Sequence, residues 1–299
     1  MGVDIVPLKA CTLNCVYCQL GRTSRLTVER KEYVPVEPVL AELKTRLAEG
    51  VNADFITISG SGEPTLNSRL GELIDGIRKI TKIPVAILTN GTLLFRPDVR
   101  KDCAKADVVL PSLDAGDEQT FQNINRPHPS ITIENHICGL CDFRKEYTGQ
   151  IWLEVFIIDG INTAPEQLAA IRDTIGLIRP DKVQLNTAVR PTAEKGIKKV
   201  DSQKLNEIAT FLGPDCEVIA DFSQKHRRPQ TPEASNSTCS DQLKESVFSI
   251  LKRRPCTIEH ISESLSISKE QARICVECLQ KHGLITAQMK NNTQFFSSK

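Results

Sequence analysis

The chain has 299 residues, with 38 Lys and Arg against 37 Asp and Glu, and hydrophobic residues make up 40% of it. This length and composition are typical of a globular protein with one large domain, or with a medium domain and a small one. A net charge of +1 creates no global basic field, so it offers no argument that the chain as a whole binds nucleic acid.

The chain shows no sequence pattern of export or membrane insertion. Its first residues do not combine a charged segment with a long apolar one, as a secretory signal peptide would. No run approaches the roughly 18 consecutive apolar residues of a membrane span. We therefore expect a cytoplasmic protein whose 11 cysteines are thiols or metal ligands rather than disulfides.

Short apolar segments alternate with helical ones over the first two-thirds of the chain. Strands are predicted over 3–8, 54–59, 84–89, 107–112, 151–158, 181–186 and 216–221, and helices over 36–50, 66–80, 97–105, 117–124, 131–147, 163–180 and 201–214. The near-continuous apolar character of 151–158 predicts a strand buried on both faces, and Thr163 is expected to cap the helix after it. The alternation predicts parallel strands joined by right-handed crossovers, in an open sheet or a curved partial barrel. Both bind ligands at the carboxyl ends of the strands.

The pattern changes after residue 222. Residues 223–240 are rich in Pro, Ser, Thr and charge, which predicts a linker. Three helices are then predicted over 241–254, 257–265 and 268–283, followed by a hairpin over 284–298 that turns at Asn291 and Asn292. This order is the outline of a winged helix-turn-helix domain. Its 9 Lys and Arg against 6 Asp and Glu form a mild positive balance, and such a domain can bind DNA, bind a peptide or dock on its own enzyme.

Three cysteines lie close together in LKACTLNCVYCQLGR, residues 8–22. Cys11, Cys15 and Cys18 stand four and then three positions apart, just after the first predicted strand. Disulfides need pairs and a closed zinc site usually needs four ligands, whereas an iron–sulfur cube on three cysteines keeps one iron open for a substrate or cofactor. The alternatives are a buried trio of inert cysteines and a zinc site completed from elsewhere in the chain.

This cysteine spacing, with the aromatic Tyr17 directly before the last cysteine, resembles the motif of the radical S-adenosylmethionine (SAM) superfamily. The segment SGSGEPTL, 59–66, is similar to the Gly-Gly-Glu segment with which that superfamily holds the methionine amino group. The matching residues are Ser61, Gly62, Glu63 and Pro64. The alternative is a plain glycine-rich turn in which Glu63 and Pro64 open a helix. A phosphate-binding loop is not expected, because no Gly-Lys-Ser/Thr follows.

Further segments of the resemblance close the later strands. Thr89 and Asn90 lie in LTNGT, 88–92, and Ser112 and Asp114 lie in LPSLDA, 110–115. The resemblance implies that Ser112 and Asp114 contact the ribose hydroxyls or the methionine carboxylate of SAM. Residues 153–162 are similar to the strand that flanks the adenine, and 184–191 to the sixth strand of the barrel.

The resemblance covers about residues 1–222 and implies a partial (βα)6 TIM-like barrel of the α/β class. It implies that the three cysteines ligate a [4Fe–4S] cluster and that SAM chelates the open iron. One-electron reduction, by a donor of the flavodoxin or ferredoxin type, then yields a 5′-deoxyadenosyl radical that abstracts hydrogen from a substrate. The chain is most similar to the branch related to wyosine-base synthases, so a tRNA base is the first expected substrate and a peptide or protein the second.

The remaining candidate residues give weaker signals. Asp159, Asn186 and Arg190 follow strands or lie near their ends, where substrate groups could be read, and Arg126 and His128 lie in a loop that could reach the site. The CxxC pairs Cys138–Cys141 and Cys275–Cys278 have helical spacing and are expected to pack in the core, an auxiliary cluster being the alternative.

The predicted organisation is therefore a radical SAM barrel over 1–222, a linker over 223–240 and a winged-helix domain over 241–299. A second hypothesis assigns the chain to a different class. In it, the chain is an iron–sulfur redox sensor whose winged helix binds DNA as a transcription regulator.

Overall fold

The computed structural model describes the chain except residues 51–52, 221–239, 254, 266, 291–292 and 299. It divides into two compact units. The first comprises residues 1–18, 22–188 and 194–220, and the second comprises 19–21, 189–193 and 221–299. The predicted linker lies almost wholly outside the described residues. Within the described part of the chain, no helix is long and apolar enough to cross a membrane.

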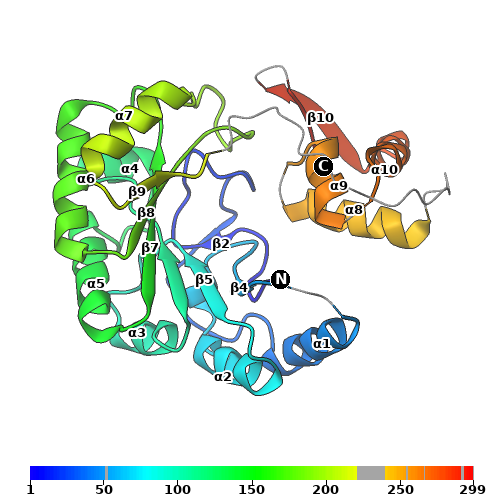
Figure 1. The fold of residues 1–299 in the computed structure, drawn as a ribbon, viewed down its shortest axis with the longest axis horizontal. Coiled ribbons are helices and arrows are strands. Elements are labelled where there is room, and N and C mark those ends of the chain that lie inside the picture. The colour runs from blue at the N-terminus through cyan, green and yellow to red at the C-terminus, as the bar shows by residue number, and fades with distance from the viewer. Residues whose placement is uncertain (51–52, 221–239, 254, 266, 291–292, 299) are drawn as a thin grey trace. The chain divides into compact units, whose positions relative to one another are not determined.

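A parallel sheet forms the centre of the first unit (Figure 1). Its strands among the described residues are β1 (Gly2–Val3), β4 (Ile56–Ile58), β5 (Val85–Thr89), β6 (Val108–Pro111), β7 (Gln150–Ile157), β8 (Lys182–Thr187) and β9 (Cys216–Val218). Each strand pairs with the next one named, and every pairing is parallel. A doubly wound sheet reverses its strand order at a switch point, whereas this order runs in one direction, so the sheet is that of a partial barrel.

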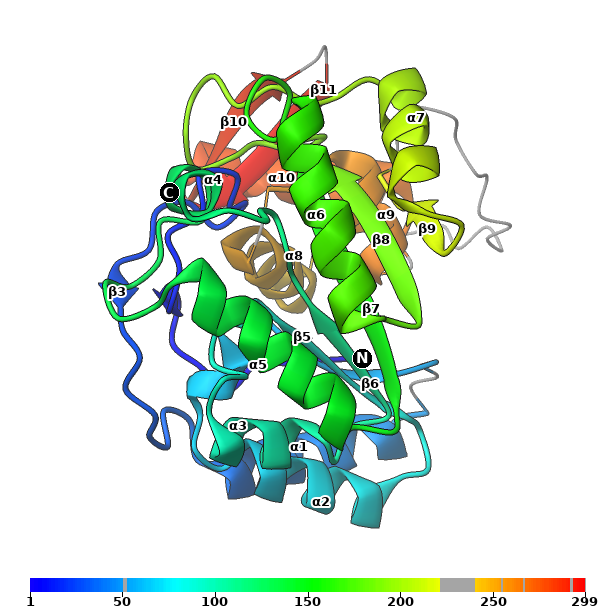
Figure 2. The ribbon, with the colours of Figure 1, turned by 90° about the vertical axis from the view of Figure 1, so that its left-hand side faces the viewer.

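Helices cover the outer face of this sheet, with α5 and α6 lying across it in Figure 2. The helices of the unit are α1 (Val36–Ala48), α2 (Leu70–Ile80), α3 (Pro97–Cys103), α4 (Glu118–Ile124), α5 (Ile133–Glu146), α6 (Pro165–Ile178) and α7 (Ser202–Leu212), with a 3₁₀ turn, η1, at Pro64–Leu66. The main core lies between sheet and helices, where Ile56, Ile87 and Leu153 meet Leu73 and Ile77 of α2 in one buried cluster.

The inner face of the sheet is partly open. Along β7 the residues Ile151, Leu153 and Val155 are buried, whereas the alternating Trp152 and Glu154 are only half-buried. On β5, Leu88 is 41% exposed, whereas Ala86, two residues earlier on the same face, is buried. The prediction that 151–158 is buried on both faces is confirmed for Phe156 and Ile158, which share a face with Trp152 and Glu154. It is wrong for Trp152 and Glu154, which are half-buried.

Several element ends differ from the sequence prediction. The first strand is shorter than 3–8, and the helix predicted over 66–80 begins at Leu70 because η1 precedes it. Thr163 does not cap α6, since its hydroxyl accepts from the Gly160 amide over 3.1 Å and the N-cap is Ala164. Two short strands, β2 (Ala10–Cys11) and β3 (Arg25–Leu26), form an unpredicted parallel pair beside the cysteine motif.

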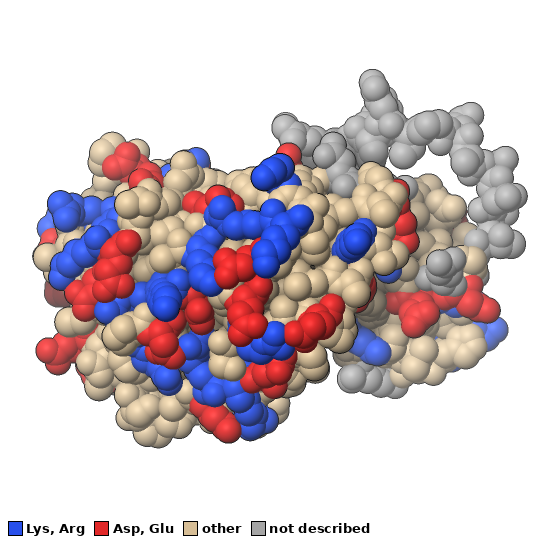
Figure 3. All heavy atoms as spheres, turned by 90° about the horizontal axis from the view of Figure 1, so that it is seen from below, with Lys and Arg blue, Asp and Glu red and all other residues tan. Residues whose placement is uncertain are grey.

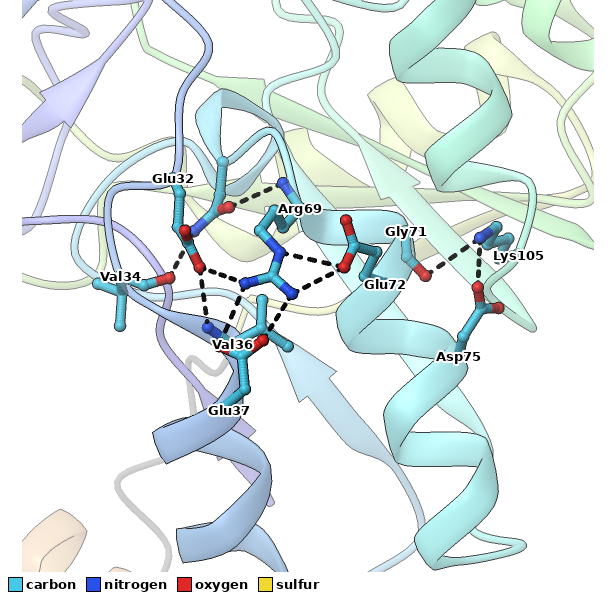
Figure 4. Close-up of polar contacts among 10 residues, drawn as sticks. Glu32, Val34, Val36, Glu37, Arg69, Gly71, Glu72, Asp75 and Lys105 are labelled. Atoms are coloured by element: carbon cyan, nitrogen blue, oxygen red, sulfur yellow. Dashed lines mark hydrogen bonds and ion pairs between the residues drawn. The ribbon is translucent and has the colours of Figure 1, made fainter.

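Arg69, directly before α2, joins the segment that leads into α1 to the start of α2 (Figure 4). Its guanidinium reaches Glu32 over 2.7 Å, Glu37 over 2.6 Å and Glu72 over 2.8 Å. One cation thus gathers three carboxylates that would otherwise repel one another, which ties together the ends of two helices.

The second unit contains the helices and hairpin expected for the C-terminal segment. These are α8 (Asp241–Arg253), α9 (Ile258–Leu265) and α10 (Lys269–Lys281), followed by the antiparallel strands β10 (Ile285–Lys290) and β11 (Thr293–Ser298). Ser268 and Gln271 form a capping box at the start of α10. The predicted turn at 291–292 lies outside the described residues. The assignment of this unit to the winged-helix class stays a prediction.

The two CxxC pairs do not both pack as expected. Cys138 is exposed on α5, so the prediction of core packing is wrong for it, while Cys141 is partly buried against the main core. On α10, Cys278 is half-buried, and Cys275 is buried and disulfide-bonded, so the expectation of thiols or metal ligands in place of disulfides is wrong for Cys275.

Candidate active site

The three cysteines of the motif lie on one loop beside the carboxyl ends of the central strands. Cys11 ends β2, and Cys15 and Cys18 follow in the loop after it. The backbone amides of residues 14 and 16 donate to carbonyls at the C-terminal end of α4, each over 2.9 Å. The loop is therefore fixed in place while its three thiols stay half-buried.

Each of the three thiols accepts a hydrogen bond from a nitrogen atom of a different segment. The three pairs are Asn90 Nδ2 to Cys11 Sγ over 3.5 Å, Asn125 Nδ2 to Cys15 Sγ over 3.5 Å, and Lys9 Nζ to Cys18 Sγ over 3.0 Å. The donors come from the end of β5, the end of α4 and the residue before β2. N–H donors around a set of sulfurs are a means of stabilising thiolate negative charge.

The surroundings of Cys11 and Cys15 favour protonated thiols when no metal is bound. Desolvation, helped by the nearby Glu63 carboxylate, raises the pKa of Cys11 to about 12. Desolvation, followed by the effect of Asp114, raises the pKa of Cys15 well above its usual value. Metal or cluster binding must displace these protons, so it is favoured as pH rises.

Glu63 lies beneath the cysteine loop and is 2% exposed. Its carboxylate accepts hydrogen bonds from the backbone N–H and the hydroxyl of Thr65 over 3.0 and 2.6 Å. It also accepts from the Thr89 hydroxyl over 2.6 Å and from the backbone N–H of Asn90 over 2.7 Å. Burial raises the pKa of Glu63, and these four donors oppose that rise. The predicted cofactor residues Glu63, Thr89 and Asn90 are thus joined in one network with Cys11.

The network can approach the cysteine loop closely because residue 62 is a glycine, which has no side chain. A Cβ at Gly62 would lie 2.0 Å from the backbone oxygen of Ala10, which is far inside van der Waals contact. The Glu63 amide donates to the same oxygen over 3.0 Å, and the Lys9 amide donates to Ser61 O over 2.6 Å. The segment 61–63 is therefore packed directly on β2, and Pro64 begins η1 behind it.

Asp114, after the end of β6, organises the other side of the loop and is 3% exposed. It accepts from the Tyr17 hydroxyl and from Asn125 Nδ2, each over 2.6 Å, and from the Phe156 amide over 2.9 Å. The Tyr17 ring stacks on Phe156, with centroids 3.9 Å apart and planes 8° apart. Burial raises the pKa of Asp114, and its three donors oppose the rise. Ser112, two residues before Asp114, forms a parallel β-bridge with Glu154 of β7.

The region with these contacts matches a known family. Residues 5–170 match the model of the radical SAM superfamily, and they include the cysteine loop, Glu63 and Asp114. The chain belongs to the radical SAM superfamily. Enzymes of this superfamily use a [4Fe–4S] cluster and SAM, and they need an electron donor.

Several relatives match almost the whole chain. A UPF0026 protein from Methanocaldococcus jannaschii is 32% identical over 270 residues, which are 90% of this chain and 82% of that protein, so the chain also belongs to the UPF0026 proteins. A protein named GTPase Obg from Brachyspira hyodysenteriae is 36% identical over 281 residues, which are 94% of this chain and 40% of that protein. This chain spans about two-fifths of the length of the Brachyspira hyodysenteriae protein. The sequence of this chain contains no Gly-x4-Gly-Lys-Ser/Thr segment, which is the phosphate-binding motif of many GTPases.

Solved structures share the fold. The structure of TYW1 with a lysine-pyruvate adduct bound superposes with a TM-score of 0.55 and 19% identity, covering 71% of this chain and 72% of TYW1. The structure of Streptococcus suis SuiB bound to S-adenosylmethionine has a TM-score of 0.55 and 18% identity, covering 75% of this chain and 51% of SuiB. At this identity the likeness shows the radical SAM fold.

The donor set of the loop fits the cluster of the superfamily. Cysteine thiolates are the usual ligands of [4Fe–4S] clusters, and three of them leave one iron for an outside ligand. Among the described residues, no three His, Cys, Asp or Glu side chains converge so as to hold a single metal ion. A four-iron cluster binds each thiolate on a different iron, so the three thiols need not converge on one point.

Most of the weaker candidates lie in surface ion pairs or hydrogen bonds. The pairs are Asp159 with Lys204 over 2.8 Å, Arg126 with Glu194 over 2.7 Å and His128 with Ser130 over 2.8 Å. Asn186 instead donates to Glu154 over 3.0 Å on the inner face of the sheet, and Arg190 belongs to the second unit.

Sequence reasoning did not single out Lys9, Asn125 or Phe156. No local pattern marks Asn125 and Phe156, because they meet the cysteine loop only once α4 and β7 are in place. Lys9 had one available signal, since it is a cation two residues before the first cysteine of the motif.

Proposed function

We propose that this chain is a radical SAM enzyme that holds a [4Fe–4S] cluster on Cys11, Cys15 and Cys18 and binds SAM at the open iron. The observation that carries the proposal is the set of three thiols, each with its own N–H donor, beside the carboxyl ends of β5 and β6. When bound, the cluster and SAM supply reductive cleavage of the sulfonium to a 5′-deoxyadenosyl radical, which abstracts hydrogen from a substrate.

The protein's own residues divide this task. Asn90 and Asn125 orient the thiols of Cys11 and Cys15 through their amides. Tyr17 is fixed by its hydrogen bond to Asp114 and by stacking on Phe156, which holds the loop in place directly before Cys18. These contacts position the three cysteines.

The contacts to SAM follow from the segments at the strand ends. We assign the methionine amino group to Ser61, Gly62, Glu63 and Pro64, with Thr89 and Asn90 behind them. We assign the ribose hydroxyls or the methionine carboxylate of SAM to Ser112 and Asp114. Glu63 and Asp114 are both used in internal hydrogen bonds, so their part in binding is to hold the backbone around them.

The substrate class follows from the sequence resemblance to the branch related to wyosine-base synthases. A tRNA base is the first substrate and a peptide or protein the second, with the C-terminal domain presenting it or regulating access. On the inner face of the sheet, Glu154 and Asn186 are hydrogen-bonded to each other over 3.0 Å. On the face drawn in Figure 3, Lys and Arg are interspersed with Asp and Glu, so this face offers no broad basic surface to RNA.

The redox-sensor hypothesis is not favoured. Its signature would be DNA binding that changes with the state of the cluster, without turnover of SAM. Membership of the radical SAM superfamily and the fold shared with SAM-bound SuiB support an enzyme instead.

The test is an anaerobic assay of SAM cleavage. The chain is reconstituted with iron and sulfide, mixed with SAM and dithionite, and analysed for 5′-deoxyadenosine by chromatography. We expect the product from the wild type and from Cys138→Ala, whose thiol is exposed on α5, and its loss in Cys15→Ala. Cleavage that survives in Cys15→Ala would contradict the proposal.

A further inference from the structure

The three N–H donors at the thiols are not equivalent. Asn90 Nδ2 lies 3.5 Å from its sulfur but 2.8 Å from Thr12 Oγ1, and Asn125 Nδ2 lies 3.5 Å from its sulfur but 2.6 Å from Asp114. Both amides are neutral, and each has a closer oxygen acceptor. Lys9 Nζ lies 3.0 Å from Cys18 Sγ and carries a full positive charge. Of these three contacts, that of Lys9 is the shortest and the charged one.

Lys9 is held in an unusual position for a lysine. The residue is 6% exposed, although lysines are almost never fully buried unless they are paired. Its backbone has φ of 62°, a left-handed conformation that is uncommon outside glycine. The Lys9 amide donates to Ser61 O over 2.6 Å, and the Lys9 carbonyl accepts from the Arg25 amide over 3.1 Å. The backbone on both sides of the lysine is thus anchored to neighbouring segments.

A fixed cation at a ligating sulfur has a predictable electrostatic effect. One-electron reduction of a cluster adds an electron from the external donor and no atom, so the cluster becomes one unit more negative. A positive charge in contact with a cluster ligand stabilises the reduced form more than the oxidised form. Hydrogen bonds and charge near the sulfurs are among the factors that set the potentials of such clusters.

We propose that Lys9 is a positioning residue that raises the reduction potential of the cluster by holding its ammonium group against the Cys18 sulfur. The inference rests on the proposed function, because it requires the cluster to bind at this loop. Lys9 acts through Cys18 and makes the cluster easier for a donor of the flavodoxin or ferredoxin type to reduce.

The test is a redox titration of the full chain, reconstituted anaerobically and followed by the electron paramagnetic resonance (EPR) signal of the reduced cluster. The variants are Lys9→Met, which removes charge and donor, Lys9→Gln, which keeps N–H donors without charge, and Lys9→Arg, which keeps both. Lys101→Met removes an exposed charge on α3 and is the matched control. The readout is the midpoint potential, which is independent of substrate and of turnover.

At the potential where the wild type is half reduced, we expect about a tenfold lower ratio of reduced to oxidised cluster in Lys9→Met. This corresponds to a potential about 59 mV more negative for a one-electron couple. Lys9→Gln should show a smaller fall, and Lys9→Arg and Lys101→Met should match the wild type. Equal potentials in Lys9→Met, Lys101→Met and the wild type would overturn the inference.

Failure of cluster loading is also decisive. If Lys9→Met and Lys9→Gln do not load a cluster but Lys9→Arg does, the charge at Cys18 is required and the inference is supported. If none of the three Lys9 variants loads a cluster, the role of Lys9 is not its charge and the inference fails. A wild-type chain that binds no [4Fe–4S] cluster would instead refute the proposed function itself.

Discussion

Replacing Gly62 with alanine should separate the Gly-Glu segment from the cysteine loop. The added Cβ would lie 2.0 Å from Ala10 O, and because this is a backbone atom no side chain can move aside. An ordinary C···O contact is about 3.3 Å, so the segment must shift by about 1.3 Å. That shift removes the two backbone hydrogen bonds that join residues 61 and 63 to residues 9 and 10.

The expected cost follows from these contacts. Two backbone hydrogen bonds at about 1 kcal/mol each, with about 1–3 kcal/mol for overpacking, lower the free energy of unfolding of the first unit by about 3–5 kcal/mol. For a unit of this size the Tm falls by about 10 °C. Thermal unfolding followed by circular dichroism measures the change, and cluster loading per chain should fall with it.

Gly176→Ala is the matched control. Gly176 lies in α6, and a Cβ there would meet no atom within 4 Å. Alanine in a helix interior should therefore stabilise the unit slightly, by about 0.5–1 kcal/mol. A Gly62→Ala variant that keeps the wild-type Tm and full cluster loading would refute the reasoning about this close approach.

Three further predictions concern charged and titratable groups. Arg69→Ala should destabilise the first unit by leaving the three carboxylates of Figure 4 unpaired, and urea unfolding should show that the difference shrinks as salt is added. Burial raises the pKa of Glu154 from 4.5, so its protonated form favours folding and stability is lost as pH rises. Glu154→Gln should thus be more stable than the wild type near pH 7 and equal to it near pH 4, and a constant difference would contradict this. Burial lowers the pKa of His136 from 6.5 to about 4, because the folded protein favours the neutral imidazole. The free energy of unfolding should therefore fall as the pH drops below 6.5, and the ring NMR signals of His136 should not titrate above about pH 5.5.

The sequence predicted the order of elements well because each strand is a short apolar run closed by a turn residue. LTNGT covers the last residues of β5 and the turn after it, and LPSLDA does the same for β6, so the side chains at the carboxyl edge could be named before the fold was known. The cysteine spacing and the Gly-Glu segment carried the family resemblance, and the family match confirmed it. Each of these signals lies within a few consecutive residues, so it can be recognised in a single sequence without knowledge of the fold.

What the sequence could not predict depends on contacts between distant segments. The Asp114 carboxylate accepts hydrogen bonds from Tyr17, Asn125 and Phe156, which come from three other segments, and no local pattern indicates these partners. Strands β2 and β3 escaped detection because two residues are too few to show a period. The half-buried positions of β7, Trp152 and Glu154, were missed because one face of the strand changes from half-buried at these residues to buried at Phe156, where the cysteine loop packs on it.

If Cys11, Cys15 and Cys18 hold a four-iron cluster with one iron open to SAM, SAM must alter the electronic structure of the reduced cluster. The most direct measurement is the EPR spectrum of the dithionite-reduced, anaerobically reconstituted chain, recorded before and after addition of SAM. We expect a reduced-cluster signal whose g-values change when SAM is added, with both the signal and the change absent in Cys15→Ala. A reduced cluster whose spectrum is identical with and without saturating SAM would show that no iron is open to SAM.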